Sequence, residues 1–500
     1  MLQFKLSNNL AHPLWVLFVA LAPAANGWAA EESVSQAWAR MCRALDYEQL
    51  DAATVEKLRL TTCDWVGVVA YTSQLDEVRR YGQVADSGGA EEATELVSGR
   101  RVPTAVAASI NAFAIHGHEI DDSNLRNQLR ASCIAVPAAL ATAELEDASG
   151  RELIVGLAIA YHVSDRLATV MNRQPGGMLH SRGWMPSSVC GTVGAAAAAA
   201  WLRDLEVEQI AHAMGLAAAG AGGLFQYYFD GSDEKRLHVA RSQTVAAESA
   251  ALAEAGFVGA SHAIEGPAGL LAGFAFEPDR DQLLTGFGAF DGVLHVKPKF
   301  YACSQGVIPW LEALVGIRRS NAFRAADVRE ITIFVPHPAD SLYVRKINDF
   351  KPPTRVIDAQ LSVNTGVALM LLEGDAFLDQ FHVERFTAPD VVELAQRVQA
   401  ISDVARAGQL RVELRDGRML EGRYPLSRLV EPYVPVVADY RRKFDRLTDR
   451  FEAAQRDALW DHAYHFPEAE SVAAWCARLS VLLEHDAAQV PATAAGERGR

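Results

Sequence analysis

The sequence predicts a mainly α-helical protein in which a large all-α domain is joined to a smaller α+β domain. From about residue 33 to residue 288, one helical pattern follows another, and many of these segments are rich in small residues. After Gly292, apolar and polar residues alternate as they do in half-buried strands. From Tyr440 the pattern is amphipathic and helical again, which predicts that the chain returns to the helical bundle.

Small residues dominate two segments of the helical half, Gly191 to Leu202 and Met214 to Phe225. Small side chains let helices approach one another closely, so this half is expected to be a tight bundle. The glycines between 220 and 223 are interpreted as packing residues within a helix. Charged residues between 203 and 208 argue against a membrane-type interface between small-residue helices.

Two strands are predicted in the α+β domain, at 328–336 and at 410–420, and the second contains an Asp-Gly turn. Helical patterns lie between these strands, at 362–374 and 388–401. The predicted organisation is a helical domain over 31–293, an α+β domain over 294–425, and a helical return with a frayed tail over 426–500.

Composition and charge limit the possible functions. The 500 residues are 50% hydrophobic, which is ample for a large core, and the formal net charge is −15. Such an acidic chain is poorly suited to a nucleic-acid backbone or an anionic membrane, so neither partner is expected. The six cysteines are scattered without a close pair, which predicts buried free thiols and neither a zinc site nor a disulfide framework.

The first 30 residues differ from the rest of the chain. An apolar run from Leu14 to Ala25 is too short to span a membrane but suits the core of a signal peptide, with a cleavage site at 27–29. A non-native extension upstream of the true start would look similar, and the two interpretations are equally supported. Export is expected only if this segment is a signal peptide.

The segment from Phe113 to Ser132 concentrates titratable side chains at the predicted end of a helix that begins near Pro103. Asp, Ser and Asn at 122–124 favour a loop, because these side chains bond to nearby backbone. A charged cluster at the mouth of a packed core is a binding or catalytic candidate, with a solvated helix end as the alternative. The cluster consists of His116, His118, Glu119, Asp121 and Asp122.

Several other chemistries are disfavoured by the sequence. The run HGHEIDD superficially resembles the HxHxD cluster of binuclear metal hydrolases, but its helical setting predicts no metal site. The chain has no GxSxG elbow, P-loop or GxGxxG after a strand, which argues against common serine hydrolases, NTPases and dinucleotide enzymes.

Two lysines stand near glycines and aromatic residues. Lys235 is expected in a polar loop before a helix that begins near His238, and Lys299 at the entry to the α+β domain. In so acidic a chain, both are candidate ligands for an anion or an enolate, although a solvated lysine is the commoner alternative.

A series of motifs resembles the MmgE/PrpD family over about residues 63 to 444. NAFAIHGHEIDDS resembles the family's NG-x-x-AH-x-x-D-x-DD-T segment, and TTCDWVGVVAYTS its early Asp-centred helix. RGWMPSSVCGTVGAAAAAAWL is similar to RG-x-H-x-TSV-x-G-x-x-GAAAAA, and the segment from Glu234 to Phe274 is similar to the block from K-x-LH-x-G to EG-x-x-GF. KFYACSQGVIP and YRRKFDRL take the places of the KPYPCC-like and terminal KF elements.

The resemblance implies a helical domain closed by the C-terminal helices, an α+β lid, and a homodimer with the site between the domains. It also implies a cytoplasmic lyase or isomerase without a cofactor that removes a proton next to a carboxylate of a small di- or tricarboxylate. Loss of water is the expected outcome, with loss of carbon dioxide and epimerisation as alternatives. This chemistry requires a base, cations for the carboxylates and a donor for the enolate charge.

Carried over position by position, the resemblance implies two sets of site residues. The catalytic set is Asp121, Asp122, Lys235, His238 and Lys299. The substrate-binding set is His116, His118, Glu119, Ser123, Arg130, Arg182, Met185, Arg241, Ser304 and Thr365. Structural roles remain the alternative, since an Asp of the loop can cap a helix and a His can be a satisfied core residue.

Four proton-handling or polar groups of the family pattern are exchanged in this chain. Arg130 replaces the histidine after the DD loop, and Met185 replaces the histidine of RG-x-H. Ser304 replaces a histidine after the Pro-Cys-like segment, and Thr365 replaces a lid tyrosine. Neither Arg130 nor Met185 can exchange a proton, although Arg130 can bind a carboxylate through two hydrogen bonds.

Two interpretations follow from these departures. In the first, an active enzyme has moved its acid-base duty to His118, His238, Lys299 or an acidic residue, and Arg130 binds the substrate. In the second, a degenerate member binds a small acid or only dimerises. The first is favoured because the Asp and Lys set is retained.

Overall fold

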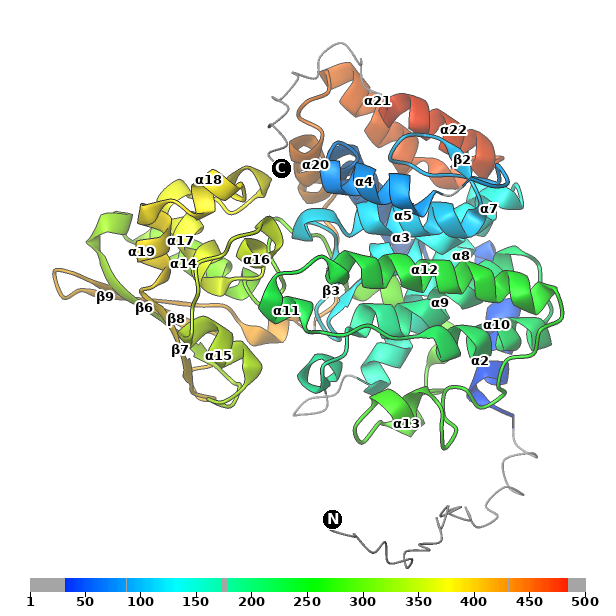
Figure 1. Ribbon diagram of the computed structural model, residues 1–500, viewed down its shortest axis with the longest axis horizontal. Coiled ribbons are helices and arrows are strands. Elements are labelled where there is room, and N and C mark those ends of the chain that lie inside the picture. Colours follow the sequence, from blue (N-terminus) through cyan, green and yellow to red (C-terminus); the bar gives the residue numbers. More distant parts are fainter. Residues whose placement is uncertain (1–31, 87, 172–177, 430, 484–500) are drawn as a thin grey trace, which may run out of the picture.

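The computed structural model describes residues 32–86, 88–171, 178–429 and 431–483. The predicted signal peptide or extension at 1–30 lies outside the described residues, as does the end of the predicted tail. Figure 1 shows a large helical domain beside a smaller α+β domain that holds the larger sheet. The predicted fold class is therefore confirmed.

The helical domain is built from helices of very different length, with a few two-residue strands between them. Its helices are α2 (Val34–Arg43), α3 (Ala52–Thr72), α4 (Asp76–Ala85), α5 (Thr104–Ile115), α6 (Ser132–Ala135), α7 (Pro137–Leu145), α8 (Gly150–Met171), α9 (Pro186–Leu202), α10 (Val207–Gly220), α11 (Tyr227–Asp230), α12 (Glu234–Glu254) and α13 (Leu270–Phe274). Its strands are β1 (Ala93–Thr94), β2 (Arg101–Val102), β3 (Ser123–Asn124), β4 (Leu129–Arg130) and β5 (Val296–Lys297).

Helix α9 is the centre of this domain and packs against α8, α10 and α12. All of its residues from 186 to 200 are buried. Gly194 faces α8 so closely that an added Cβ would lie 2.6 Å from the carbonyl oxygen of Ala160. The small residues of the sequence thus allow the close helix approach that the composition predicts.

We expect Gly194→Ala to destabilise the protein by about 1–3 kcal/mol, because the new methyl group overpacks the α8–α9 contact. Gly316→Ala is the matched control, since Gly316 lies in a helix with no atom within 4 Å of the added Cβ. There the gain in helix propensity should stabilise by up to about 1 kcal/mol. Urea denaturation of both variants measures the difference, and equal effects would contradict the packing argument.

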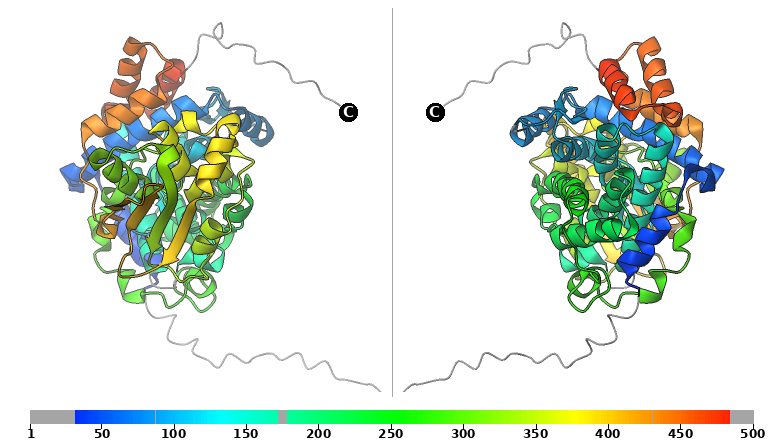
Figure 2. Two further views of the ribbon diagram at one scale, coloured as in Figure 1. Left: turned by 90° about the vertical axis from the view of Figure 1, so that its left-hand side faces the viewer. Right: turned by 90° about the vertical axis from the view of Figure 1, so that its right-hand side faces the viewer.

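The α+β domain contains a four-stranded sheet in the order β7-β6-β8-β9, onto which the left-hand view of Figure 2 looks. The β6–β7 pair is parallel and the other two pairs are antiparallel. Its strands are β6 (Val328–Val335), β7 (Val398–Ser402), β8 (Gln409–Leu414) and β9 (Met419–Arg423). Its helices are α14 (Ile308–Ser320), α15 (Leu342–Asn348), α16 (Val356–Gln360), α17 (Val363–Glu373), α18 (Val383–Phe386) and α19 (Pro389–Ala395).

Three sequence predictions of local structure need correction. The segment predicted as a helix at 388–401 ends as a helix at Ala395 and continues as β7. The prediction was wrong because the apolar residues at 391, 394, 395, 398 and 401 keep a helical spacing through the strand. The helix predicted to reach Phe225 ends at Gly220, and Gly223 lies in the irregular segment that follows, with φ of 132°. Helix α12 begins at Glu234, so Lys235 lies in its first turn rather than in a loop.

The last helices lie against the helical domain, at the top of Figure 1. They are α20 (Val437–Leu447), α21 (Ala453–Tyr464) and α22 (Val472–Leu483), so the amphipathic stretch after Tyr440 is divided into two helices. Phe444 of α20 packs 3.0 Å from the position of a Cβ on Gly67 of α3. Arg59 of α3 forms an ion pair of 2.5 Å with Glu468 beyond α21.

All six cysteines are buried free thiols, as the sequence predicts. Helix α8 is long and apolar enough to cross a membrane by length and composition, but 89% of its most apolar window is buried inside the protein. Buried core helices commonly meet the same criteria.

Candidate active site

A strained loop follows the end of α5 and carries the acidic cluster. Its short 3₁₀ turn spans Gly117–Glu119, and both His118 and Glu119 have positive φ, at 53° and 54°. Residues other than glycine rarely adopt this backbone conformation, so two such residues in a row require support from their surroundings. We call residues 116–123 the acidic loop.

Three side chains from distant segments donate hydrogen bonds to successive carbonyl groups of the acidic loop. Gln360 of α16 donates to the His118 carbonyl at 2.8 Å, and Lys443 of α20 donates to the Ile120 carbonyl at 2.7 Å. Lys299 donates to the Glu119 carbonyl at 3.0 Å. The strained backbone is therefore held by both domains together.

The Glu119 carboxylate lies among three cations, which we call the cation cage: Arg130, Lys235 and Lys299. Lys299 Nζ is 3.4 Å and Arg130 Nη2 is 3.5 Å from Glu119 Oε2, and Lys235 forms an ion pair with Oε1. Glu119 and both lysines are no more than 2% exposed. Charges this deeply buried need partners, and the three basic side chains supply them to the Glu119 carboxylate.

His116 and Asp121 form a buried pair beside the cation cage, with 2.7 Å between His116 Nδ1 and Asp121 Oδ2. Burial opposes ionisation of Asp121, but His116 and Lys299 hold its pKa below the usual value. Burial and the Lys235 charge lower the pKa of His116 to about 3. Asp121 is therefore ionised and His116 neutral near neutral pH.

Asp122 belongs to a different environment from Asp121, although the two are adjacent in sequence. One Asp122 oxygen accepts a hydrogen bond of 2.8 Å from the Ser132 backbone, and the other lies 2.6 Å from Ser132 Oγ. Burial raises the pKa of Asp122 to about 7, and the negative charge of Asp64 adds to the shift. Asp122 thus faces away from the cation cage toward a second buried cluster.

The second cluster consists of Lys57, Asp64, Asp122 and Lys443. Lys443 Nζ lies 2.7 Å from Asp64 Oδ1, and both side chains are buried. Lys57 Nζ lies 4.5 Å from the ring centre of Tyr433, and burial lowers its pKa to about 7. The sequence prediction named Asp122 but missed Lys57, Asp64 and Lys443 as site residues. The available signal was a lysine among the core-facing positions of each contributing helix.

We expect Asp122→Asn to change how stability depends on pH. The Asp122 pKa is raised from 3.8 to about 7 on folding, so wild-type stability falls as pH rises from about 4 to about 7. Asparagine cannot ionise, and the variant should gain stability over the wild type across this range, by on the order of a few kcal/mol. Urea denaturation at pH 5 and pH 7 measures the gain. A constant difference between the two proteins would show that Asp122 does not titrate in this range.

Three other predicted site residues are buried: Ser123 within the acidic loop, Ser304 and Met185. Ser123 Oγ accepts a hydrogen bond of 3.3 Å from Arg130 Nη1. The Ser304 backbone donates to the Gln360 carbonyl at 2.9 Å, which connects it to the loop through Gln360. Met185 is buried at the start of α9, and its backbone N–H donates to the Gly223 carbonyl.

The remaining predicted site residues are not in contact with the cation cage. His118 Nε2 lies 2.8 Å from Glu77, which also forms an ion pair with Arg236, so the His118 ring belongs to that cluster. Thr365 donates to Ser362 within the start of α17. Arg182 is exposed and donates to the Phe274 carbonyl, Arg241 is exposed on α12, and His238 is half-buried one turn after Lys235.

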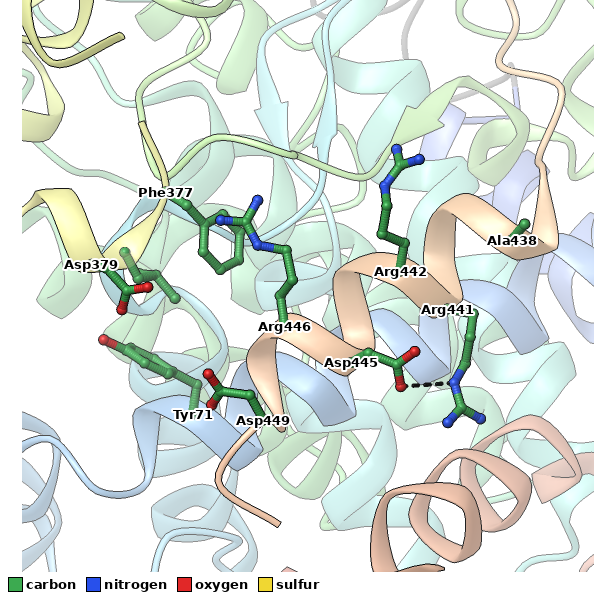
Figure 3. A pocket seen from close by; sticks show the side chains of 10 residues that line it. Tyr71, Phe377, Asp379, Ala438, Arg441, Arg442, Asp445, Arg446 and Asp449 are labelled. Carbon is green, nitrogen blue, oxygen red and sulfur yellow. Dashed lines mark hydrogen bonds and ion pairs between the residues drawn. The ribbon is translucent and has the colours of Figure 1, made fainter. Parts of the chain in front are cut away.

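A cavity of about 520 Å³ lies outside the cation cage. It is lined by Arg441, Arg442 and Arg446 of α20 together with Tyr71 and Phe377, as Figure 3 shows. These arginines have acidic partners, because Arg446 pairs with Asp375 at 2.6 Å and Arg441 with Asp445 at 2.8 Å. This cavity is a charge-balanced groove and does not include the acidic cluster.

A metal ion does not suit the one group that could hold it among the described residues. Ligand atoms of His116, Asp121 and Cys133 lie within 4.8 Å of one another. However, burial raises the pKa of the Cys133 thiol, which keeps it protonated. The neighbouring cation cage also repels a second positive charge.

Comparison with known proteins identifies the family. The model of the MmgE/PrpD N-terminal domain matches residues 36–282, and that of the MmgE/PrpD C-terminal domain matches residues 301–464. A cis-aconitate decarboxylase-like protein of Aspergillus oryzae is 26% identical over 387 residues, which cover 71% of this chain and 78% of the relative. Cis-aconitate decarboxylases of Aspergillus terreus and Mus musculus are each 24% identical, over 71% and 74% of this chain and 76% and 75% of the relatives. The chain belongs to the MmgE/PrpD family.

Proposed function

We propose that this protein is a lyase that acts on a small di- or tricarboxylic acid without a cofactor. The observation that carries the proposal is the buried Glu119 carboxylate among Arg130, Lys235 and Lys299. A substrate carboxylate would compete with Glu119 for the same donors. Family membership and the relatives named as cis-aconitate decarboxylases support a reaction of the dehydratase or decarboxylase type.

The proposed reaction develops negative charge on a carboxylate bound in the cation cage. When a proton leaves the carbon next to that carboxylate, the electron pair spreads into its oxygens as an enolate. Lys235, Lys299 and Arg130 stabilise this charge in a water-poor site, where electrostatic interactions are strong. Loss of hydroxide from the neighbouring carbon would complete a dehydration, which is the outcome we favour.

Decarboxylation is the second candidate, because the relatives carry that name. A non-catalytic carboxylate-binding protein is the third, supported by the Arg130, Met185, Ser304 and Thr365 departures. We also propose a homodimer on the basis of the family resemblance.

Product analysis by proton NMR tests the proposal. Purified protein is incubated with citrate, 2-methylcitrate, cis-aconitate and malate. The Lys351→Met variant, in which an exposed lysine is replaced, is incubated in parallel as a control that should keep full activity. Turnover of at least one acid by wild type and control supports a lyase. Thermal stabilisation by an acid without any turnover would instead support the binding protein.

A further inference from the structure

One ring nitrogen in the candidate active site lacks a partner. His116 Nε2 is buried and has no hydrogen-bond partner among the described residues. An unsatisfied buried nitrogen costs on the order of 1–3 kcal/mol, so such atoms are rare unless they serve a ligand or a reaction. The ring is joined to the cation cage through Asp121, whose Oδ1 lies 3.5 Å from Lys299 Nζ while its Oδ2 lies 2.7 Å from His116 Nδ1.

The hydrogen bond on the other side of the ring determines which nitrogen carries the proton. Asp121 is ionised, and an ionised carboxylate can only accept hydrogen bonds. His116 Nδ1 must therefore donate its proton to Asp121 Oδ2 at 2.7 Å. In the neutral ring this leaves Nε2 with a lone pair and no proton, which is the state of a base.

The geometry points to His116 Nε2 as the base that takes the proton from the carbon next to the bound carboxylate, with Asp121 holding the ring in the required tautomer. This inference rests on the proposed function and adds a role that the sequence comparison did not assign to His116. In the step, the carbon–hydrogen bond breaks and a bond from hydrogen to Nε2 forms. The electron pair enters the enolate, and Asp121 stabilises the resulting imidazolium.

The other candidate bases are less suited to this role. His118 is engaged by Glu77, and His238 is half-buried with no carboxylate bound to its ring. Lys299 is occupied by three hydrogen-bond acceptors of the acidic loop, and Lys235 by Glu119. Among these candidates, His116 is the one that combines a bare nitrogen with a carboxylate that stabilises its protonated form. His162 also has a bare Nε2 and a carboxylate, Asp291, 3.5 Å from its Nδ1, but its ring packs against Phe287 and Phe290.

Substrate binding itself would activate this base. In the free protein, burial and the charges of Lys235 and Arg130 lower the pKa of His116 to about 3. A substrate carboxylate that shares these cations with Glu119 would add a negative charge near the ring, and the basicity of Nε2 would rise. The base would then act only when its substrate is bound.

The inference separates the possible reactions. Dehydration and epimerisation both begin with removal of a proton, which a bare Nε2 can perform. Decarboxylation instead leaves a carbanion that must receive a proton, and a bare Nε2 has none to give. A reaction that starts with deprotonation is therefore expected.

Deuterium exchange tests the base. In heavy water, the wild type should incorporate deuterium next to a carboxylate of one of the four acids above. His116→Gln and Asp121→Asn should each lower the exchange rate at least 100-fold. His162→Gln is the matched control, because His162 is a buried histidine that packs against Phe287. It should exchange at the wild-type rate.

Nitrogen-15 NMR of the histidine rings provides a readout that needs no substrate. At pH 7 we expect a protonated Nδ1 and an unprotonated Nε2 for His116, with the signal assigned by its loss in His116→Gln. Three results would overturn the inference and leave the proposed function in place. They are the opposite tautomer, a charged His116 ring, and exchange at the wild-type rate by a folded His116→Gln variant. Turnover that releases carbon dioxide without deprotonation also overturns the inference but leaves the lyase in place. No turnover or exchange by wild type overturns the proposed function, and the inference fails with it.

Discussion

Lys235→Met is expected to lower kcat/KM for the true substrate by about 10²- to 10³-fold. The side chain loses the ammonium that pairs with Glu119 in the buried cation cage, while its length and apolar stem are retained. The variant should destabilise the transition state more than the bound substrate, because the negative charge on the bound carboxylate is greatest in the transition state. Steady-state kinetics on any acid that the wild type converts measure the loss.

The Lys351→Met control removes an exposed lysine and should leave kcat/KM within about twofold. Circular dichroism and thermal unfolding must show that Lys235→Met is folded. Wild-type activity in a folded Lys235→Met would exclude this lysine from the reaction, and the cation cage would have to be interpreted as structural.

Lys443→Met is expected to destabilise the protein by about 3–5 kcal/mol. The variant leaves Asp64 as a buried carboxylate without its ion-pair partner, and it removes the donor to the Ile120 carbonyl in the strained acidic loop. Removing one member of a buried ion pair costs more than the pair contributes, because the other charge stays desolvated. Urea denaturation measures the change.

Two further variants separate this effect from the loss of any charge on α20. Arg446→Met removes an ion pair with Asp375 whose side chains are 39% and 33% exposed, and it should cost no more than about 1 kcal/mol. The double variant Lys443→Met with Asp64→Leu should recover part of the stability, since no buried charge is then unpaired. If Lys443→Met and Arg446→Met lowered the free energy of unfolding equally, burial of the ion pair would not explain the cost of breaking it.

Much of the fold could be predicted from local patterns. The alternating segments became β6 and the β8–β9 hairpin, and the small-residue segment became α9 with its close neighbours. The errors concern segments whose state depends on their surroundings. The apolar residues of β7 continue the helical spacing of α19, at 391, 394, 395, 398 and 401, so the pattern alone does not show where the helix ends and the strand begins.

The candidate site was predictable in composition but not in arrangement. Asp121 and Asp122 were both placed in the predicted catalytic set. In the structure, Asp121 faces the cation cage and Asp122 faces the second cluster. The loop backbone places consecutive side chains on different sides. Gln360, Lys57 and Lys443 were not expected, because their contacts with the loop or with its neighbouring cluster join residues far apart in sequence.

The amino-acid sequence was sufficient to establish the family resemblance, the main fold class and the chemical types available to the site, including an arginine and a methionine where the family has histidines. Those conclusions depend on residue identity and short-range spacing. The choice of Glu119 as the centre of the cation cage, and of His116 as the ring with a bare nitrogen, emerged from the packed chain. Burial and contacts across 180 residues set the protonation states there, and neither quantity is encoded in any single segment.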